Sequence, residues 1–153
     1  MPNWVYNRIT TDEKNLYLLS EISKVGLARY YRPMPEAIQN TVAPTKITED
    51  FTEKDLNELL AVYGFSNWYD WSIHNWGTKW GCCQNHMENN SYIYRTPWGP
   101  LKIDLLELLA NDIPNFTYIW EEEQGYGEKW ICKNGELKME ISWNMYTLFD
   151  ISG

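Results

Sequence analysis

Asp70 and His74 are the two residues whose types and spacing come closest to catalytic chemistry. On a helix, side chains four positions apart lie on one face and can meet. A carboxylate that orients a histidine is half of a general-base dyad. No nucleophile motif such as Gly-x-Ser-x-Gly accompanies the pair, so the sequence assigns no catalytic residue. A helix-capping Asp70 and a surface His74 explain the spacing more simply.

Cysteine and histidine also gather near position 83, as a metal site would require. Cys82 and Cys83 are adjacent, and neighbouring residues of a strand point to opposite faces, so the two thiols rarely share one metal. Together with His86 they form no Cys-x-x-Cys arrangement of the kind that holds zinc. Gly77 and Gly81 match no phosphate-binding loop. We therefore predict reduced, buried thiols, no metal and no cofactor.

Residues 67–80 read NWYDWSIHNWGTKW and hold four of the nine tryptophans. Such rings build either a Trp-rich core or a half-wet binding surface, because each has a large apolar body and one polar tip. Polar residues are interleaved with the rings, and each would need a partner once buried. We therefore predict a ligand- or partner-binding surface, although the sequence does not assign individual rings to core or pocket. The candidate binding residues are Asn67, Trp68, Asp70, Trp71, His74, Asn75, Trp76, Lys79, Trp80 and Trp98.

Composition narrows the choice of partner. The 153 residues carry a formal net charge of −8, and 16% of them are aromatic. General nucleic-acid binding needs a basic face that neutralises phosphates, so we expect none. The start of the chain lacks the basic and apolar regions of a signal peptide, and no apolar run reaches membrane length. We therefore expect a cytoplasmic protein that does not enter a membrane.

The first half of the chain predicts a strand, a helix and a long irregular segment. Residues 3–10 alternate as a strand. Thr10 and Glu13 have capping-box spacing and predict the start of a helix that Gly26 ends. Residues 29–50 contain three prolines and show no clear period, which indicates an irregular connection.

Two further helices are predicted before position 78. Thr52 caps the first, which Gly64 ends. Asn67 or Ser66 caps the second, which Gly77 ends. The first helix carries an apolar stripe that we expect to be buried. This stripe consists of Leu56, Leu59, Leu60 and Tyr63.

The second half predicts most of a sheet. Strands are expected at residues 78–84, 91–96 and 116–122, with a turn at residues 84–90. The apolar residues 101–109 predict a buried helix that begins near Pro100. Asn134-Gly135 predicts a hairpin turn. Its register pairs Cys132 with Leu137 and Trp130 with Met139, and places Leu137, Met139, Ile141 and Trp143 on one face.

The order of these elements predicts an α+β fold. Strand, helix, strand, strand, helix and strand spell a ferredoxin-like βαββαβ sandwich, in which two helices cover one face of an antiparallel sheet. Residues 27–77 are then a long helical and loop insertion after the first helix, and the hairpin is a C-terminal addition. Residues 1–153 are expected to form a single domain.

Several stretches together carry a family resemblance. They are the opening MPNWVYNRIT, Pro33-Met34-Pro35, the aromatic residues 67–80, residues 94–100 and the late EEEQGYGEKW. In this order they resemble the YubB-type ferredoxin-like domain family of bacteriophages and conjugative plasmids. Pro97 and Gly99 differ from the residues that the family usually has at these positions. The resemblance implies a ferredoxin-like fold and a mobile-element origin, hence the host cytoplasm, and it supplies no catalytic residue.

Three functional hypotheses follow. In the first, which we prefer, a small non-enzymatic phage or mobile-element protein binds and inhibits a host protein, such as a component of antiviral defence. In the second, an aromatic pocket around residues 67–80 sequesters a small nucleotide signal. In the third, an enzyme uses Asp70 and His74. The predicted partner is thus a host protein or a small nucleotide ligand, and the sequence predicts no oligomeric state.

Overall fold

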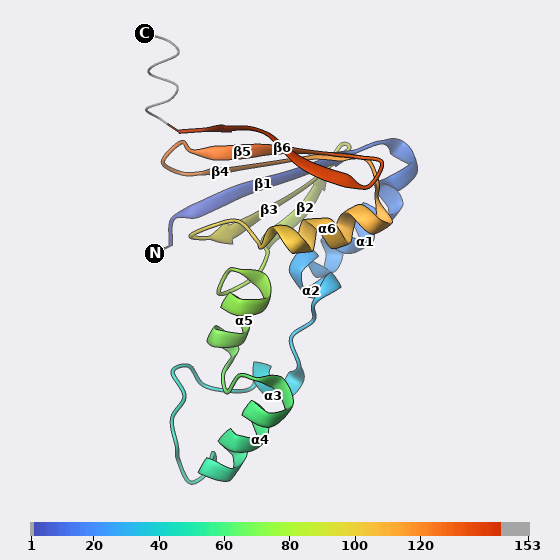
Figure 1. Cartoon of the computed structure of the whole chain (residues 1–153). Coiled ribbons are helices and arrows are strands. Elements are labelled where there is room, and N and C mark those ends of the chain that lie inside the picture. The colour runs from blue at the N-terminus through green and yellow to red at the C-terminus, as the bar shows by residue number, and fades with distance from the viewer. Residues whose placement is uncertain (1, 145–153) are drawn as a thin grey trace.

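The computed structural model describes residues 2–144 and has the predicted α+β architecture (Figure 1). A six-stranded antiparallel sheet has the strand order β2-β3-β1-β4-β5-β6. Two helices, α1 and α6, lie against one face of this sheet, and α3 to α5 extend away from it. In chain order the elements are β1 (Trp4–Thr11), η1 (Glu13–Asn15), α1 (Leu16–Val25), α2 (Leu27–Tyr31), α3 (Glu36–Gln39), α4 (Glu53–Tyr63), α5 (Trp68–Trp76), β2 (Cys83–Glu88), β3 (Ser91–Pro97), α6 (Ile103–Asp112), β4 (Phe116–Glu122), β5 (Gly127–Lys133) and β6 (Glu136–Trp143).

β1 lies at the centre of the sheet. It pairs with β3 on one side and with β4 on the other, so that Ile9 faces both Tyr92 and Tyr118. Asn7 is buried on the helix side of β1. Its amide nitrogen donates to the hydroxyl of Thr96 at 3.1 Å, and its oxygen accepts from the hydroxyl of Tyr118 at 2.7 Å. A buried amide with partners on both atoms ties three central strands together without leaving a polar group unsatisfied.

The core lies between the sheet and the helices α1 and α6. Leu19 and Ile22 of α1 and Leu105 and Leu109 of α6 are fully buried. Gly26 ends α1 as predicted, with a φ of +95° that most other residues adopt only with strain. Within residues 2–144, no helix combines the length and the apolar character needed to cross a membrane.

α6 is buried as predicted, but it begins at Ile103 rather than near Pro100. The backbone N–H of Lys102 donates to the carbonyl of Trp76 at 2.9 Å. This bond joins residue 102 to the last turn of α5, and the helix starts one residue later.

The helix predicted from Thr10 also begins later. β1 continues through Thr11, and α1 starts at Leu16 after the short η1. The capping box between Thr10 and Glu13 does not form, because the Thr10 hydroxyl instead hydrogen bonds with that of Ser91 on β3 at 2.7 Å. A contact distant in sequence has overridden a local helix signal.

The strand predicted at residues 78–84 is wrong, because β2 occupies Cys83–Glu88 instead. The backbone N–H of Gly81 donates to the hydroxyl of Thr78 at 3.0 Å, and Gly81 has a φ of +68°. These two features make residues 78–81 a tight turn. The predicted turn at residues 84–90 shrinks to the positions around Asn89, whose φ is +54°.

The C-terminal hairpin turns at residues 134–135 with the predicted pairs. A register shift then intervenes, and Lys129 faces Ile141 while Trp130 faces Met139. Because Lys129 and Trp130 point to opposite faces of the sheet, their partners do so as well. The prediction that Leu137, Met139, Ile141 and Trp143 share one face is therefore wrong.

Residues 27–77 form α2 to α5. α2 joins the core through the buried Leu27 and Ala28, with the Leu27 N–H donating to the Tyr92 hydroxyl of β3 at 3.1 Å, whereas α3 to α5 extend away from the sheet (Figure 1). α4 has the predicted cap, in which the Asp55 N–H donates to the Thr52 hydroxyl at 3.3 Å and the Thr52 N–H donates to the Asp55 carboxylate at 2.9 Å. The predicted burial of the stripe holds only in part, because Leu56 and Leu59 are half-buried, with Leu59 packed against the core, whereas Leu60 and Tyr63 are exposed. α4 lies at the far end of the insertion, beyond the reach of the sheet. We call residues 36–66 the α3–α4 lobe.

Candidate functional site

α5 carries most of the candidate residues, and its two ends are those predicted. The side-chain oxygen of Asn67 accepts a 2.8 Å hydrogen bond from the backbone N–H of Asp70 and so caps the helix. Gly77 ends it in the left-handed region with a φ of +83°. A Cβ on Gly77 would meet the Lys102 side chain at 2.8 Å, so the close approach to the start of α6 also requires glycine.

Two of the candidate rings belong to the core. Trp71 and Trp76 are buried and meet edge to face, with ring centroids 5.1 Å apart. The indole N–H of Trp76 donates to the carbonyl of Arg32 at 2.9 Å, and the Arg29 guanidinium lies 4.9 Å from the Trp76 ring. These contacts fasten α5 to α2, so the two tryptophans position the site without forming its surface.

Asn75 is also structural. Its side-chain nitrogen donates to the carbonyl of Trp71 at 2.9 Å, and its own carbonyl accepts from the Arg32 guanidinium at 2.9 Å. The same guanidinium forms a 2.9 Å ion pair with Asp104 on α6. Arg32 is therefore a joint between α2, α5 and α6.

Five candidates meet at one cleft between α5 and the preceding loop. The cleft has a volume of about 670 Å³. Two tryptophans and a tyrosine supply aromatic walls, and amide, carboxylate, hydroxyl and ammonium groups supply polar ones. We call it the aromatic cleft, and its lining residues are Ala43, Pro44, Thr45, Asn67, Trp68, Tyr69, Asp70, Lys79 and Trp80.

Polar contacts order one wall of the aromatic cleft. The side-chain nitrogen of Asn67 donates to the Thr45 hydroxyl at 2.9 Å and to the Asp70 carboxylate at 3.0 Å. On another wall, the Lys79 ammonium lies 4.1 Å from the centre of the Trp80 ring. The Asn67 amide is fully used within the chain, so the cleft offers rings for stacking, the Asp70 carboxylate as a hydrogen-bond acceptor and one cation for an anionic group.

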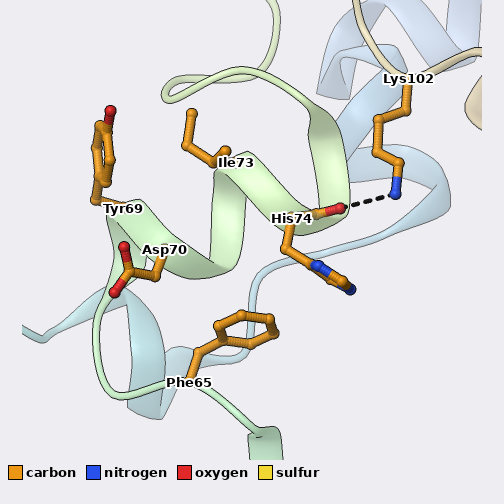
Figure 2. Close-up of a pocket in the computed structure, with 6 residues that line it drawn as sticks. All are labelled: Phe65, Tyr69, Asp70, Ile73, His74 and Lys102. Atoms are coloured by element: carbon orange, nitrogen blue, oxygen red, sulfur yellow. Dashed lines mark hydrogen bonds between the residues drawn. The ribbon is translucent and has the colours of Figure 1, made fainter.

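A second hollow shares Tyr69 and Asp70 with the aromatic cleft and also contains His74 (Figure 2). The His74 ring packs against that of Phe65, with ring centroids 5.0 Å apart. The backbone carbonyl of His74 accepts a hydrogen bond from the Lys102 ammonium at 3.0 Å. Figure 2 shows the Asp70 carboxylate and the His74 imidazole turned away from each other. The expected meeting of these two side chains is therefore wrong, and no base dyad is assembled in this arrangement.

Trp98 lies outside the aromatic cleft. It is 55% exposed in the turn after β3, where its φ of +70° accompanies a 2.8 Å hydrogen bond from its N–H to the carbonyl of Asn3. Trp98 is therefore the one candidate tryptophan that lies neither in the core nor along the aromatic cleft.

Sequence reasoning missed the loop that closes the cleft. Ala43, Pro44 and Thr45 lie in the segment predicted as irregular, and only the polar Thr45 next to a proline hinted at a role. Their contact with Asn67 spans about twenty residues of chain, and no periodic pattern connects the two stretches.

The predicted burial of the thiols holds for Cys132, whereas Cys82 and Cys83 are only half-buried. Burial raises the pKa of the Cys82 thiol to about 11 and raises that of Cys83 as well. Both are therefore protonated at neutral pH, when they are poor nucleophiles and poor metal ligands. Among residues 2–144, His, Cys, Asp and Glu side chains form no group of three or more that could hold a metal ion.

Comparison with known protein families, with curated proteins and with solved structures gives no match to this chain. The resemblance to the YubB-type family therefore stays a prediction from the sequence.

Proposed function

We propose that this chain is a non-enzymatic binding protein of a bacteriophage or another mobile element. It acts in the host cytoplasm, where it binds and inhibits a host protein such as a component of antiviral defence. The α3–α4 lobe is the contact surface. The support for this proposal comes from the burial, the charge and the position of that lobe.

The observation that carries the proposal is the unburied apolar face of α4. Leu60 is 44% exposed and Val62 is 71% exposed, and Tyr63 also lies open. Val42 and Ile47, in the segment before α4, are exposed too. Leu60 and Tyr63 are three residues apart and share one side of α4, whereas Val62 lies on another side. Exposed apolar side chains that gather at one end of a molecule are typical of a surface that a partner covers.

Charge adds to this argument. Residues 46–58 contain five carboxylates and two lysines around the apolar face, which gives the tip of the lobe an acidic rim. A polar rim around an apolar centre is the usual anatomy of a protein interface. The complementary partner therefore presents an apolar groove with basic residues at its edge.

The strand order supports the finer fold proposal. β1, α1, β2, β3, α6 and β4 occur in the order of a βαββαβ unit, and their strands lie side by side as β2-β3-β1-β4. We therefore propose a ferredoxin-like core that β5 and β6 extend. Together with the sequence resemblance, this proposal favours an origin in the YubB-type family of mobile elements.

Capture from a bacterial lysate tests the function. The wild type is compared with a Leu60→Glu, Val62→Glu double variant and with Tyr17→Glu, which alters a 79% exposed ring on α1 far from the lobe. We expect one host protein to be retained by the wild type and by Tyr17→Glu and to be lost from the double variant. Identical captured sets for all three proteins, or no capture at any salt concentration, would contradict the proposal.

The aromatic cleft supports a second candidate, the binding of a small nucleotide. Trp68 and Trp80 would stack on the base, the Asp70 carboxylate that Asn67 orients would accept a hydrogen bond from its edge, and Lys79 would meet a phosphate. A thermal-shift screen against a nucleotide panel tests it, because a ligand at 100 times its Kd adds about 2.7 kcal/mol of stability. The shift should vanish in Trp68→Ala and persist in Trp98→Ala. Flat curves, or a shift that Trp68→Ala leaves intact, would exclude this candidate.

A further inference from the structure

Among residues 2–144, no helix covers the face of the sheet opposite α1 and α6 (Figure 1). Alternation along β1 puts Trp4, Tyr6 and Arg8 on this face, because the residues between them are buried on the other. Tyr6 is 42% exposed although it lies on the central strand. Together with Trp4 and Trp80 next to it, this ring makes one side of the sheet rich in accessible aromatic surface.

Rings and cations follow one another along this side of β1. The ring of Trp80 lies 6.2 Å from that of Trp4 and carries the Lys79 ammonium at 4.1 Å. Two residues beyond Trp4, the Arg95 guanidinium of β3 lies over the Tyr6 ring, 4.9 Å from the ring centroid. We call this row the β1 stripe, and it consists of Lys79, Trp80, Trp4, Tyr6, Arg95 and Arg8.

The β1 stripe concentrates positive charge on an acidic chain. It holds three cations, whereas the whole chain has a formal net charge of −8. Two carboxylates border the stripe: Asp70 lines the aromatic cleft beside Lys79 and Trp80, and Glu121 lies opposite Tyr6 on β4, where it accepts a 3.0 Å hydrogen bond from the indole N–H of Trp143. Glu88 lies on the same face two strands away from β1, on the edge strand β2. The three cations lie beside exposed rings, where they can contact an anionic ligand, while the carboxylates stand at the borders of the stripe.

We propose that the β1 stripe binds a short segment of single-stranded nucleic acid. Bases stack on the rings of Trp80, Trp4 and Tyr6, and the three cations meet the phosphates between them. Three cations are too few for tight binding of duplex, which fits the acidity of the rest of the chain. This site is separate from the α3–α4 lobe, so it does not depend on the proposed function.

The number of cations and rings in the β1 stripe predicts the salt dependence of binding and the loss of affinity when one ring is removed. Three phosphate contacts on a single strand give a slope of about −2 for the logarithm of the binding constant against the logarithm of the salt concentration. Loss of one stacking ring lowers the affinity by roughly 5- to 150-fold. RNA and DNA share this chemistry, so both backbones are tested.

The experiment measures the fluorescence anisotropy of labelled ten-nucleotide oligo(dT) and oligo(U) in titrations with the wild-type protein at low salt. Tyr6→Ala and Arg95→Ala change the stripe without touching the aromatic cleft. Trp68→Ala changes the cleft alone. Tyr17→Ala and Lys138→Ala are the matched ring and charge controls, since Tyr17 lies on α1 and Lys138 is paired with Glu136 at 3.3 Å on β6. Melting curves confirm that each variant folds.

We expect binding of at least one oligonucleotide, weakened by Tyr6→Ala and Arg95→Ala and unchanged in Trp68→Ala and in both controls. The salt slope should fall by about one third in Arg95→Ala, which loses one of three cations. The absence of binding at 100 µM protein would overturn the proposal. Binding that Trp68→Ala abolishes and Tyr6→Ala leaves intact would also overturn it, because the ligand would then lie in the cleft.

Discussion

α6 and α4 have similar sequences and opposite environments. One reads IDLLELLAND and the other EKDLNELLAVY, and both place leucines at helical spacing. In α6, Leu105 and Leu109 are fully buried against the sheet. In α4, Leu60 and its neighbours remain open at the end of the α3–α4 lobe. The difference shows that apolar periodicity predicts a face that needs a partner, while the fold decides whether that partner lies within the chain.

The comparison separates stability from recognition. The sheet with α1 and α6 buries its apolar residues and holds the molecule together. The α3–α4 lobe has one fully buried anchor, Ile38, and leaves its other large apolar residues half-buried or exposed. Substitutions in the core should therefore change stability, and those in the lobe should change binding.

The largest expected effect is that of Leu105→Ala. It removes a fully buried side chain and leaves a cavity, which typically costs about 2–5 kcal/mol of unfolding free energy. Leu60→Ala is the matched control on α4 and should change stability by about 0.5 kcal/mol or less. Urea denaturation followed by circular dichroism measures both. Equal losses in the two variants would remove the distinction between core and lobe.

Arg32→Ala should have the next largest effect. It breaks the ion pair to Asp104 and the hydrogen bond to the Asn75 carbonyl, and we expect a loss of about 1–3 kcal/mol. Hydrogen exchange should show that α5 opens more readily while β1 stays protected. Lys24→Ala, which removes an exposed pair with Glu21, is the control. A uniform loss of hydrogen-exchange protection across the sheet would mean that Arg32 stabilises the whole core rather than the contact between α2, α5 and α6.

The local parts of this fold could be predicted from sequence. The caps at Thr52 and Asn67, the stop at Gly77 and the turn at residues 134–135 each depend on a few adjacent residues. The misplaced elements depend on distant ones. Thr10 does not cap a helix because its hydroxyl hydrogen bonds with that of Ser91, which is 81 residues away in the sequence. A pattern of neighbouring residues cannot predict such a contact.

The candidate site shows the same division. Residues 67–80 were predicted as a binding surface, and half of the ten candidates line one cleft. The spacing could not show that Trp71 and Trp76 turn toward the core while Trp68 and Trp80 line the cleft, because all four lie within one aromatic stretch. Thr45 was missed since it reaches Asn67 only through the folded loop.

Asn67→Ala should have a moderate effect at the boundary between core and lobe. It removes the cap of α5 and the bond to Thr45, at a cost of about 1 kcal/mol. Asn67→Asp keeps a capping oxygen and should recover most of that loss. Thermal melting compares the three proteins. If the Asp variant were no more stable than the Ala variant, the cap would not be the reason for the loss.

The smallest effect concerns the cap of α4. The backbone N–H of Thr52 holds the pKa of the Asp55 carboxyl below its usual range. A carboxyl with a lower pKa in the folded state stabilises above its unfolded pKa, near 3.9, and loses that contribution as the pH falls through the folded value. The wild type should therefore lose helicity in α4 below about pH 4. Amide chemical shifts measure this loss.

Asp55→Asn supplies the reference for that titration. It lacks the titrating carboxyl, so the difference in α4 helicity between the two proteins should be largest near neutral pH and disappear in acid. A constant difference from pH 6 to pH 2 would show that the Asp55 carboxylate does not stabilise the cap.

Site-specific photocrosslinking in bacterial cells tests the central claim most directly. A photoreactive phenylalanine analogue is placed at position 60 or 62 of α4, at position 17 of α1 and at position 141 on the open face of the sheet. We expect a crosslinked adduct with one host protein from positions 60 and 62 and none from positions 17 and 141. An adduct from position 17 or 141 but not from α4 would contradict the assignment of the α3–α4 lobe as the contact surface.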